Sequence, residues 1–298
     1  MPDIDVSAEK QIKLVINRIH NLPTPPIVFT QVNKVLNNPD TSAYQIGSII
    51  SEDPALTAKV LKLTNSAFYG LPRTVTSVKQ AIVILGLDAV RSLVLSASVF
   101  ETFSKQGNID KDYLDSFWRH SLSVGFMSRI IFRTKSFPSF LEAEESFSAG
   151  LLHDIGKIVI FSHLPNEFKQ IREIFKNNPK EDYCAIEEQV LGFNHALVGS
   201  FLAQKWNLSD ELATAIKYHH NPEEDDSDNI TTYVIHLSNY LSQISEQENS
   251  LSNENNTYCS PIAWEKLGVK PDQEEQLIQT LQAEYMKAET FLNMARGD

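Results

Sequence analysis

The 298-residue sequence predicts an all-α protein. Apolar residues recur at the three- and four-residue spacing of helices along most of the chain, whereas period-2 alternation bounded by turn residues is hard to find. Apolar residues make up 42% of the chain, which is enough for one large core or two smaller ones. We therefore expect two helical subdomains, residues 1–108 and residues 109–298.

The first two helices are expected where capping residues precede an apolar stripe. Thr41 or Ser42 is a typical N-cap. Asp53 followed by Pro54 begins the second helix, because aspartate accepts hydrogen bonds from free N–H groups and proline is favoured at the first helical position. The side chains expected to face inward are Ile46, Ile49, Ile50, Leu56, Val60 and Leu63.

Two further helices complete the first subdomain. One is expected from Val78 to Leu85, and Gly86 suits its C-terminus. Asp88 is expected to cap the other, which carries an apolar stripe to Phe100. The polar stretch 104–108 contains a glycine and is predicted to be the linker to the second subdomain.

The second subdomain is expected to be a bundle of longer helices. The expected segments are 117–131, a helix through Ala149 and Gly150 into His153, the apolar run 158–161, 192–206, a helix capped by Ser209 and running to His220, 230–241 and 274–294. The candidate site residues lie at the ends or along the edges of these expected helices.

Composition excludes several classes of protein. The formal net charge of -12 argues against a nonspecific grip on nucleic acid, which needs clustered lysine and arginine. No apolar run approaches the roughly 20 residues that cross a bilayer, and the first residues lack a secretory signal, so a cytoplasmic protein is expected. Cys184 and Cys259 stand far apart and predict neither a disulfide nor a thiolate zinc site.

The stretch LLHDIGK at residues 151–157 is the most informative motif, because further polar side chains at helical positions can converge on its histidine and aspartate. The full set of candidate ligands is His120, His153, Asp154, His195, His219, His220 and Asn239. Imidazole and carboxylate ligands suit Fe, Mn, Ni or Zn, and such an ion can activate water against phosphorus. The alternative is ordinary helix packing, in which each histidine is a hydrogen-bonded core residue.

The spacing within the motif restricts the kind of site. Consecutive helical positions diverge by about 100°, so His153 and Asp154 suit a metal at a helix end or two metals bridged by the carboxylate. Lys157 follows Asp154 by three residues and can neutralise that carboxylate or meet a ligand phosphate. If the site is catalytic, Asp154 and Lys157 are the expected catalytic residues.

The ligand pattern resembles the HD superfamily of metal-dependent phosphohydrolases, and within it the HD-GYP cyclic-dinucleotide phosphodiesterases. Two departures matter. That branch places a metal-binding aspartate where this chain has Asn239, and the chain reads NPEE at 221–224 without the Gly-Tyr-Pro loop. An amide is a neutral and weaker ligand, which weakens the case for one metal position and its activated water.

The N-terminal half resembles the HDOD family, the HD-related output domain. The motifs are LPTP at 22–25, ISEDPAL at 50–56, LTNSAFY at 63–69 and AIVILG at 81–86, and the resemblance runs from about residue 15 to about residue 245. It implies a helical N-terminal subdomain packed on an HD-like helical bundle. Family members are bacterial, are often attached to receiver or other signalling domains, and are generally regarded as regulatory modules.

Three functions follow as alternatives. The first is a cytoplasmic regulatory protein that signals through contacts with a protein partner and keeps the HD-like pocket for a metal, a nucleotide or stability. The second is a metal-dependent phosphohydrolase or phosphodiesterase that acts on a nucleotide or cyclic dinucleotide. The third is a scaffold whose grooves accept a partner's amphipathic segment.

Overall fold

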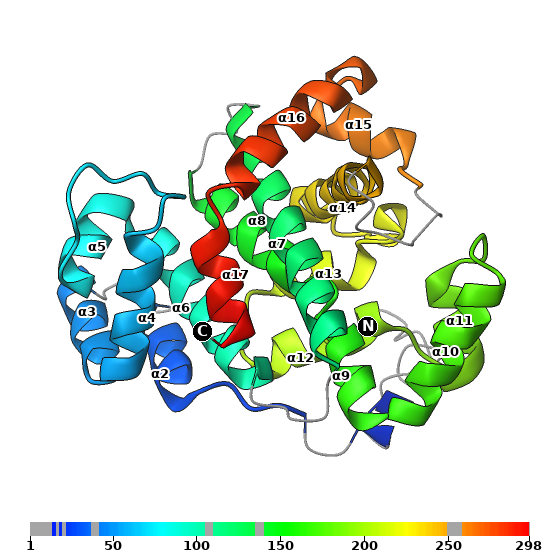
Figure 1. The fold of residues 1–298 in the computed structure, drawn as a ribbon, viewed down its shortest axis with the longest axis horizontal. Helices are drawn as coiled ribbons and strands as arrows, with labels where there is room; N and C mark the ends of the chain where they lie inside the picture. The colour runs from blue at the N-terminus through cyan, green and yellow to red at the C-terminus, as the bar shows by residue number, and fades with distance from the viewer. Residues whose placement is uncertain are drawn as a thin grey trace.

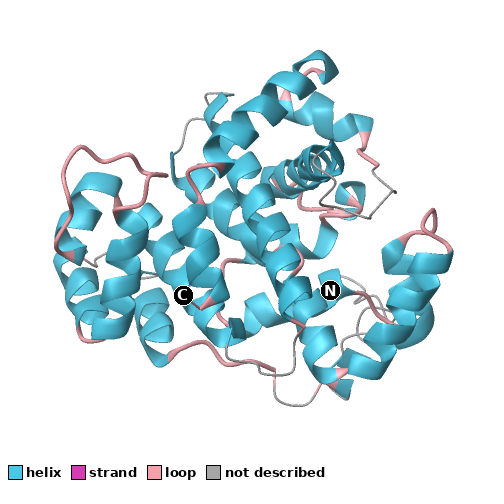
Figure 2. Cartoon of the chain, viewed as in Figure 1, coloured by secondary structure: helices cyan, strands magenta, loops and turns pink. Residues whose placement is uncertain are grey.

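The structure is a computed structural model that describes residues 14–15, 18–19, 22–36, 42–104, 110–134, 140–248 and 258–297. Within these residues all regular structure is helical and there is no strand (Figure 2). The predicted all-α class is therefore confirmed. None of the described helices combines the length and the apolar character that crossing a bilayer requires.

The N-terminal helices gather at one end of the molecule (Figure 1). They are α2 (Ile27–Leu36), α3 (Ala43–Ser51), α4 (Pro54–Thr64), α5 (Val78–Leu85) and α6 (Leu87–Ser104). The remaining elements are α7 (Lys111–Thr134), α8 (Phe140–Leu152), α9 (Ile155–His163), α10 (Pro165–Asn177), α11 (Tyr183–Leu191), α12 (His195–Lys205), α13 (Asp210–Tyr218), η1 (Pro222–Glu224), α14 (Ile230–Glu248), α15 (Pro261–Leu267), η2 (Pro271–Gln273), α16 (Glu274–Tyr285) and α17 (Glu289–Arg296).

The caps of the N-terminal helices follow the sequence signals closely. Ser42 caps α3 in a capping box with Gln45, while Thr41 lies outside the described residues. The Asp53 carboxylate accepts from the backbone N–H groups of Ala55 and Leu56 at 2.9 and 3.0 Å. The cap predicted at Asp88 is wrong, because α6 already begins at Leu87. Asp88 lies in the first turn of the helix, where its charge complements the helix dipole.

Helices α7 and α8 form the centre of the bundle, and α14 and α13 pack against them. The contact between α7 and α8 is close because small residues face each other: a Cβ on Gly150 would lie 2.8 Å from the backbone of Gly125. Figure 1 shows α10 and α11 at the far end of the molecule from α3 and α5. The division of the chain at residues 108 and 109 stays a prediction.

The C-terminal segment corrects a second expectation, since 274–294 forms two helices instead of one. Helix α16 ends at Tyr285 and α17 begins at Glu289. The reason is tertiary packing, because the turn between them lets Phe291 enter an aromatic cluster with Phe68 and Phe126 at ring centroid distances of 5.6 and 5.8 Å. Helix periodicity in the sequence continues across the turn and does not reveal it.

The residues before His195 correct a third expectation. A helix was expected from Gly192 to Trp206, but Gly192 ends α11 in the left-handed conformation with φ of 84°. Helix α12 begins at His195, where Asn194 is the N-cap and accepts from the N–H of Leu197. Glycine is favoured there because an L side chain in that conformation costs free energy.

Candidate metal centre

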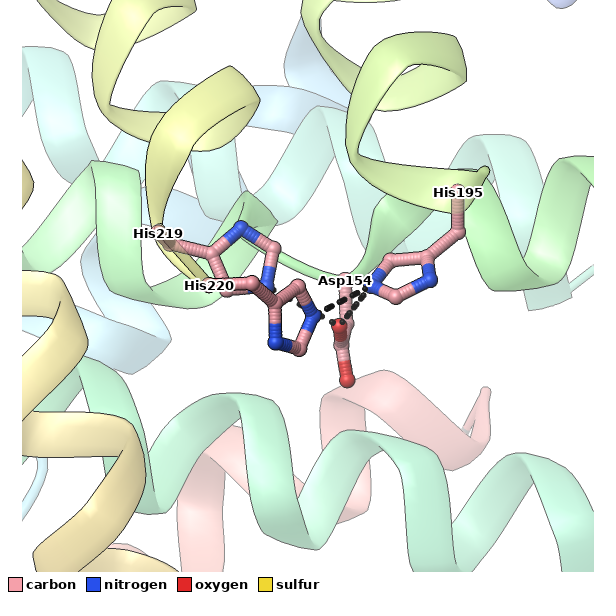
Figure 3. A group of neighbouring side chains, drawn as sticks. All are labelled: Asp154, His195, His219 and His220. Atoms are coloured by element: carbon pink, nitrogen blue, oxygen red, sulfur yellow. Dashed lines mark hydrogen bonds and ion pairs between the residues drawn. The ribbon is translucent and has the colours of Figure 1, made fainter. Parts of the chain in front are cut away.

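The HD pair lies in the turn between two helices. Helix α8 ends at Leu152 and α9 begins at Ile155, so His153 and Asp154 stand at the junction. Asp154 occupies the N-cap position of α9, yet its side chain makes no capping hydrogen bond. The carboxylate is instead directed at a cluster of histidines (Figure 3).

The structure brings six of the seven candidate residues together in two groups that share Asp154. His120, His153 and Asp154 form one group, and Asp154, His195, His219 and His220 form the other. Within each group the possible ligand atoms lie within 4.8 Å of one another. Figure 3 shows the second group, in which three imidazole rings from α12 and the end of α13 converge on the carboxylate. This is the arrangement expected for ions bridged by one carboxylate.

Each of four histidines is fixed through Nδ1 so that Nε2 faces the cluster. Nδ1 of His153 lies 2.7 Å from the carbonyl oxygen of Gly150, and Nδ1 of His219 lies 2.7 Å from that of Ile216. A carbonyl can only accept, so Nδ1 carries the hydrogen and Nε2 of the neutral ring keeps its lone pair for an ion.

Carboxylates hold the other two rings. Nδ1 of His195 lies 2.6 Å from Glu187 of α11, which also accepts from the backbone N–H of His195 at 2.8 Å. Nδ1 of His120 lies 3.0 Å from Glu246 of α14. Oxygen acceptors behind ligating histidines orient the ring and raise its basicity, and they are a regular feature of metal sites.

Two of the separations between ligand atoms are compatible with one shared ion. Nε2 of His195 lies 3.0 Å from Nε2 of His220 and 3.0 Å from Oδ1 of Asp154. Two ligands held at right angles about 2.1 Å from a single ion are about 3.0 Å apart. Two Nε2 lone pairs at this distance repel each other unless a proton or a cation lies between them.

Unsatisfied polar atoms support the same interpretation. Nε2 of His153 and Nε2 of His219 are buried and have no hydrogen-bond partner among the described residues. Leaving a buried polar atom without a hydrogen bond costs about 1–3 kcal/mol. Two such nitrogen atoms near the same carboxylate, that of Asp154, therefore indicate a ligand that binds between them. The residues present therefore fit a transition-metal ion.

Asn239 is buried on α14, and its Oδ1 has no hydrogen-bond partner among the described residues. One helical turn earlier, Nδ1 of His236 lies 2.7 Å from the carbonyl oxygen of His219, and Nε2 of His236 accepts from the N–H of Ser260. His236 is thus a core residue whose two ring nitrogens are both hydrogen-bonded. That Asn239 shares a metal position with Asp154 stays a prediction.

Burial and charge set the protonation of the metal-free cluster. Burial alone would raise the pKa of Asp154, but the neighbouring His153 ring and the Lys157 ammonium hold it well below its usual value. Burial alone would lower the pKa of His195, but the Glu187 carboxylate raises it to about 9. Burial lowers the pKa of His219 to about 3. The last of these rings is neutral at physiological pH, as a metal ligand must be.

Lys157 neutralises the carboxylate, which is one of the two roles expected for it. Its Nζ lies 2.8 Å from Oδ2 of Asp154 and 5.1 Å from the centre of the Tyr183 ring. Asp154 is therefore compensated by Lys157 on one oxygen and faces His195 with the other.

A cavity opens beside the second group. It has a volume of about 430 Å³ and lies between α11, the start of α12 and the end of α13. His220, Lys217 and Tyr218 line it together with the acidic side chains of Asp182, Glu188 and Glu224. Its size falls within the roughly 300–1,000 Å³ of small-molecule pockets.

Stability of the metal-free protein is expected to be greatest near pH 6.5. Burial lowers the pKa of His153, His219 and His220, so these rings stay neutral in the fold while an unfolded histidine takes up a proton below about pH 6.5. Unfolding then takes up protons, and stability falls with falling pH by up to about 1.4 kcal/mol per pH unit for each ring.

His195 acts in the opposite direction. Its pKa of about 9 in the fold keeps it protonated where the unfolded ring is neutral, so its contribution is lost as pH rises from about 6.5 towards 9. Urea midpoints of chelator-treated protein, measured between about pH 5 and pH 9, check both limbs. A urea midpoint that stayed constant, or that increased as the pH fell below about 6.5, would contradict the prediction.

Sequence reasoning missed Glu187 and Glu246, the two carboxylates behind His195 and His120. Glu187 is 1% exposed. Glutamate is almost never fully buried without a partner, so the sequence alone predicts that its side chain faces solvent. The only sequence signal is its place on the apolar side of α11, between Ile186 and Leu191, which are both buried.

Comparisons with known proteins match the fold and the motifs. The family model of the HDOD domain matches residues 22–222. An uncharacterized protein of Treponema pallidum (strain Nichols) is 27% identical over 228 residues, which cover 74% of this chain and 43% of that protein. The chain thus spans less than half the length of this curated relative.

Two solved structures resemble the chain over nearly its whole length. An HDOD domain protein with unknown function from Geobacter sulfurreducens superposes with a TM-score of 0.76 and 23% identity, covering 96% of this chain and 97% of that one. A protein from Shewanella amazonensis SB2B that is proposed to be a phosphohydrolase gives a TM-score of 0.75 and 22% identity, covering 95% and 98%. At these identities the likeness shows the fold alone.

Proposed function

The chain belongs to the HDOD family, the HD-related output domains, and we propose that it is a bacterial signalling module whose HD-type pocket holds a transition-metal ion. The signal leaves through contacts with a protein partner. The metal ion is proposed from one observation: the Nε2 atoms of His153 and His219 lie near Asp154 and have no hydrogen-bond partner among the described residues.

The ion would be held by the residues of the two groups. His120, His153 and Asp154 offer one position, and Asp154 with His195, His219 and His220 offers the other. Imidazole and carboxylate donors suit Fe, Mn, Ni or Zn. When bound, such an ion polarises phosphate oxygens and lowers the pKa of a coordinated water.

A binding role is favoured over turnover because the two ligand groups contain only one carboxylate. Asp154 is the one carboxylate shared by both groups, and Lys157 already compensates it at 2.8 Å. At the position where the related phosphodiesterases place a second carboxylate, Asn239 supplies a neutral amide. A divalent ion would retain surplus positive charge, which favours holding an anion such as a nucleotide phosphate.

The second candidate function is a metal-dependent phosphohydrolase acting on a nucleotide or cyclic dinucleotide. The cavity of about 430 Å³ that reaches His220 favours it, since it gives a substrate room beside the cluster. In that case Asp154 and Lys157 are the catalytic candidates. The similarity to the Shewanella amazonensis protein is consistent with either function.

Protein purified without chelator is expected to contain a first-row transition metal that is lost in His153→Ala, because this ring offers a buried and unpaired Nε2. His163→Ala is the control, since His163 bonds through Nδ1 to the carbonyl oxygen of Val159 on its own helix and belongs to neither ligand group. Elemental analysis measures the content, and acid should release the metal because protons compete for imidazole. Wild type without metal, or equal content in both variants, would contradict the prediction.

Turnover separates the two functions. The metal-loaded wild type is expected to hydrolyse neither cyclic dinucleotides nor generic phosphodiesters. Robust hydrolysis that disappears in Asp154→Ala would replace the signalling proposal with the phosphohydrolase.

A further inference from the structure

Two of the candidate ligands stand at the start of a loop, residues 219–225, which we call the ligand loop. His219 and His220 follow the last residue of α13 and point at Asp154 (Figure 3). The bond from Nδ1 of His219 to the carbonyl oxygen of Ile216 orients this ring relative to α13 only. The last carbonyl groups of a helix have no partner within the helix. The place of this end of α13 therefore depends on bonds to other elements.

His236 of α14 supplies such a bond. Its Nδ1 lies 2.7 Å from the carbonyl oxygen of His219, and its Nε2 lies 3.0 Å from the backbone nitrogen of Ser260. The residue is buried. Because a carbonyl can only accept and a backbone N–H can only donate, the hydrogen is on Nδ1 and the ring has a single orientation. Ser260 is the N-cap of α15, so one imidazole ties the backbone of His219 to the start of that helix.

The ligand loop is bonded to α14 and to the cap of α15 at two further points. The hydroxyl of Ser260 donates to the carboxylate of Glu223 in η1. The hydroxyl of Thr232, one turn before His236 on α14, donates to the buried carboxylate of Asp225 at 2.7 Å. Of these three bonds to the loop, the one from His236 is the bond that reaches a candidate metal ligand.

We infer that His236 is a positioning residue for the metal centre: it holds the backbone of His219 and thereby places the imidazole of His219 beside Asp154. The inference rests on the metal ion proposed above. Nε2 of His219 lies 3.7 Å from Oδ1 of Asp154, and ligand atoms must lie within about 0.2 Å of their bonding distances to an ion. A shift of the ligand loop by a few tenths of an ångström therefore weakens metal binding. His236 acts through His219, because both of its own ring nitrogens are engaged in other bonds.

Few side chains can replace this ring. The position requires a group that donates at one end and accepts at the other, which neutral histidine and the side-chain amides can do. Leucine fills a similar volume but leaves the carbonyl of His219 and the N–H of Ser260 without this partner. His236→Leu is therefore the disruptive variant, and His236→Gln is the conservative one.

The test is titration of the chelator-treated full chain with Co²⁺, whose visible absorption depends on the number and geometry of its ligands. His236→Leu is expected to bind Co²⁺ about 10- to 100-fold more weakly than the wild type, the range for residues that orient metal ligands. Its spectrum at saturation should also differ from that of the wild type. His236→Gln should regain most of the affinity and the wild-type spectrum.

Val60→Ala is the stability control. Val60 is fully buried in α4, at the N-terminal end of the molecule, and belongs to neither ligand group. Its truncation lowers the stability of the core by leaving a cavity. The affinity for Co²⁺ and the spectrum at saturation should stay those of the wild type.

Ser260 offers a second pair of variants, because its φ of -60° suits proline. Ser260→Pro removes the N–H from which His236 accepts and puts a ring carbon in its place. Ser260→Ala keeps this N–H and removes only the hydroxyl. Co²⁺ binding is expected to be weaker in Ser260→Pro than in Ser260→Ala, and this pair decides the question if His236→Leu does not fold.

The outcomes separate this inference from the metal proposal. Wild-type protein that binds no Co²⁺ overturns both. If the wild type binds Co²⁺ and His236→Leu matches it in affinity and spectrum, or Ser260→Pro matches Ser260→Ala, the role of His236 is overturned and the metal centre stands. The same losses in Val60→Ala would assign them to lower stability and would also overturn it. Weaker binding with an altered spectrum in His236→Leu, restored in His236→Gln, supports the inference.

Discussion

Gly156→Ala is expected to destabilise the protein by about 3 kcal/mol or more, at the upper end of what overpacking costs. A Cβ at this position would lie 2.0 Å from the carbonyl oxygen of His195 and 3.0 Å from the backbone nitrogen of Gly199. Both atoms belong to the backbone of α12 and cannot move aside as a side chain can. Helix α9 would have to separate from α12. Urea denaturation measures the loss.

The control is a second helical glycine. A Cβ on Gly47 in α3 would meet Cγ of Lys79 at 2.8 Å, but this atom is in a flexible side chain that can turn away. Alanine gains about 1 kcal/mol over glycine in a helix interior, so Gly47→Ala should be neutral or stabilising. If Gly156→Ala were as stable as Gly47→Ala, α9 and α12 would not be in the close contact described.

The same substitution should also reduce metal binding. Gly156 is two residues from Asp154, and α12 begins at His195. Separation of the two helices therefore lengthens the 3.0 Å distance between Oδ1 of Asp154 and Nε2 of His195. Metal ligands must be placed to within a few tenths of an ångström, so even the folded fraction of Gly156→Ala should carry less metal.

The helical class and most helix starts could be predicted from sequence because they depend on local chemistry. Asp53 and Ser42 cap helices through contacts with residues two or three positions ahead, which the sequence displays directly. The break between α16 and α17 depends on Phe291 reaching Phe68 and Phe126. Residues more than 150 positions apart decide it, and no local pattern reports them.

The candidate site divides in the same way. Six candidate ligands were found because histidine and aspartate are the residue types that hold metals, and because they fall at inward or terminal helix positions. Glu187 and Glu246 were missed because their role is to hold the far nitrogen of a ring on another helix. Chemical type reveals a ligand, whereas only tertiary geometry reveals the residue that orients it.

Asn239→Asp is expected to bind the metal about 10- to 100-fold more tightly than the wild type, the range by which changes around a metal site alter affinity. The substitution adds a carboxylate at a position that is 8% exposed, and this charge offsets that of a divalent ion. Without metal the same charge is buried without a partner, so the metal-free variant should be less stable than the wild type. The two effects have opposite signs, and melting temperatures with and without metal separate them.

Asn207→Asp provides the charge-matched control, because Asn207 is exposed and belongs to neither ligand group. It should change neither metal affinity nor the metal-dependent shift in melting temperature. If Asn239→Asp and Asn207→Asp had the same metal affinity and the same metal-dependent shift in melting temperature, Asn239 would lie outside the metal centre.

Hydrolysis by Asn239→Asp then tests why the wild type should be inactive. A carboxylate at 239 both neutralises the ion and supplies a candidate base for the attacking water, so activity that appears only in this variant identifies a site that lost catalysis through one side chain. Inactivity of both proteins, with tighter metal binding in Asn239→Asp, places the deficit elsewhere. One remaining explanation is the NPEE segment at 221–224, which stands in place of the Gly-Tyr-Pro loop of the related phosphodiesterases and places Glu224 in the cavity beside His220. The other is that the substrate is outside the set assayed.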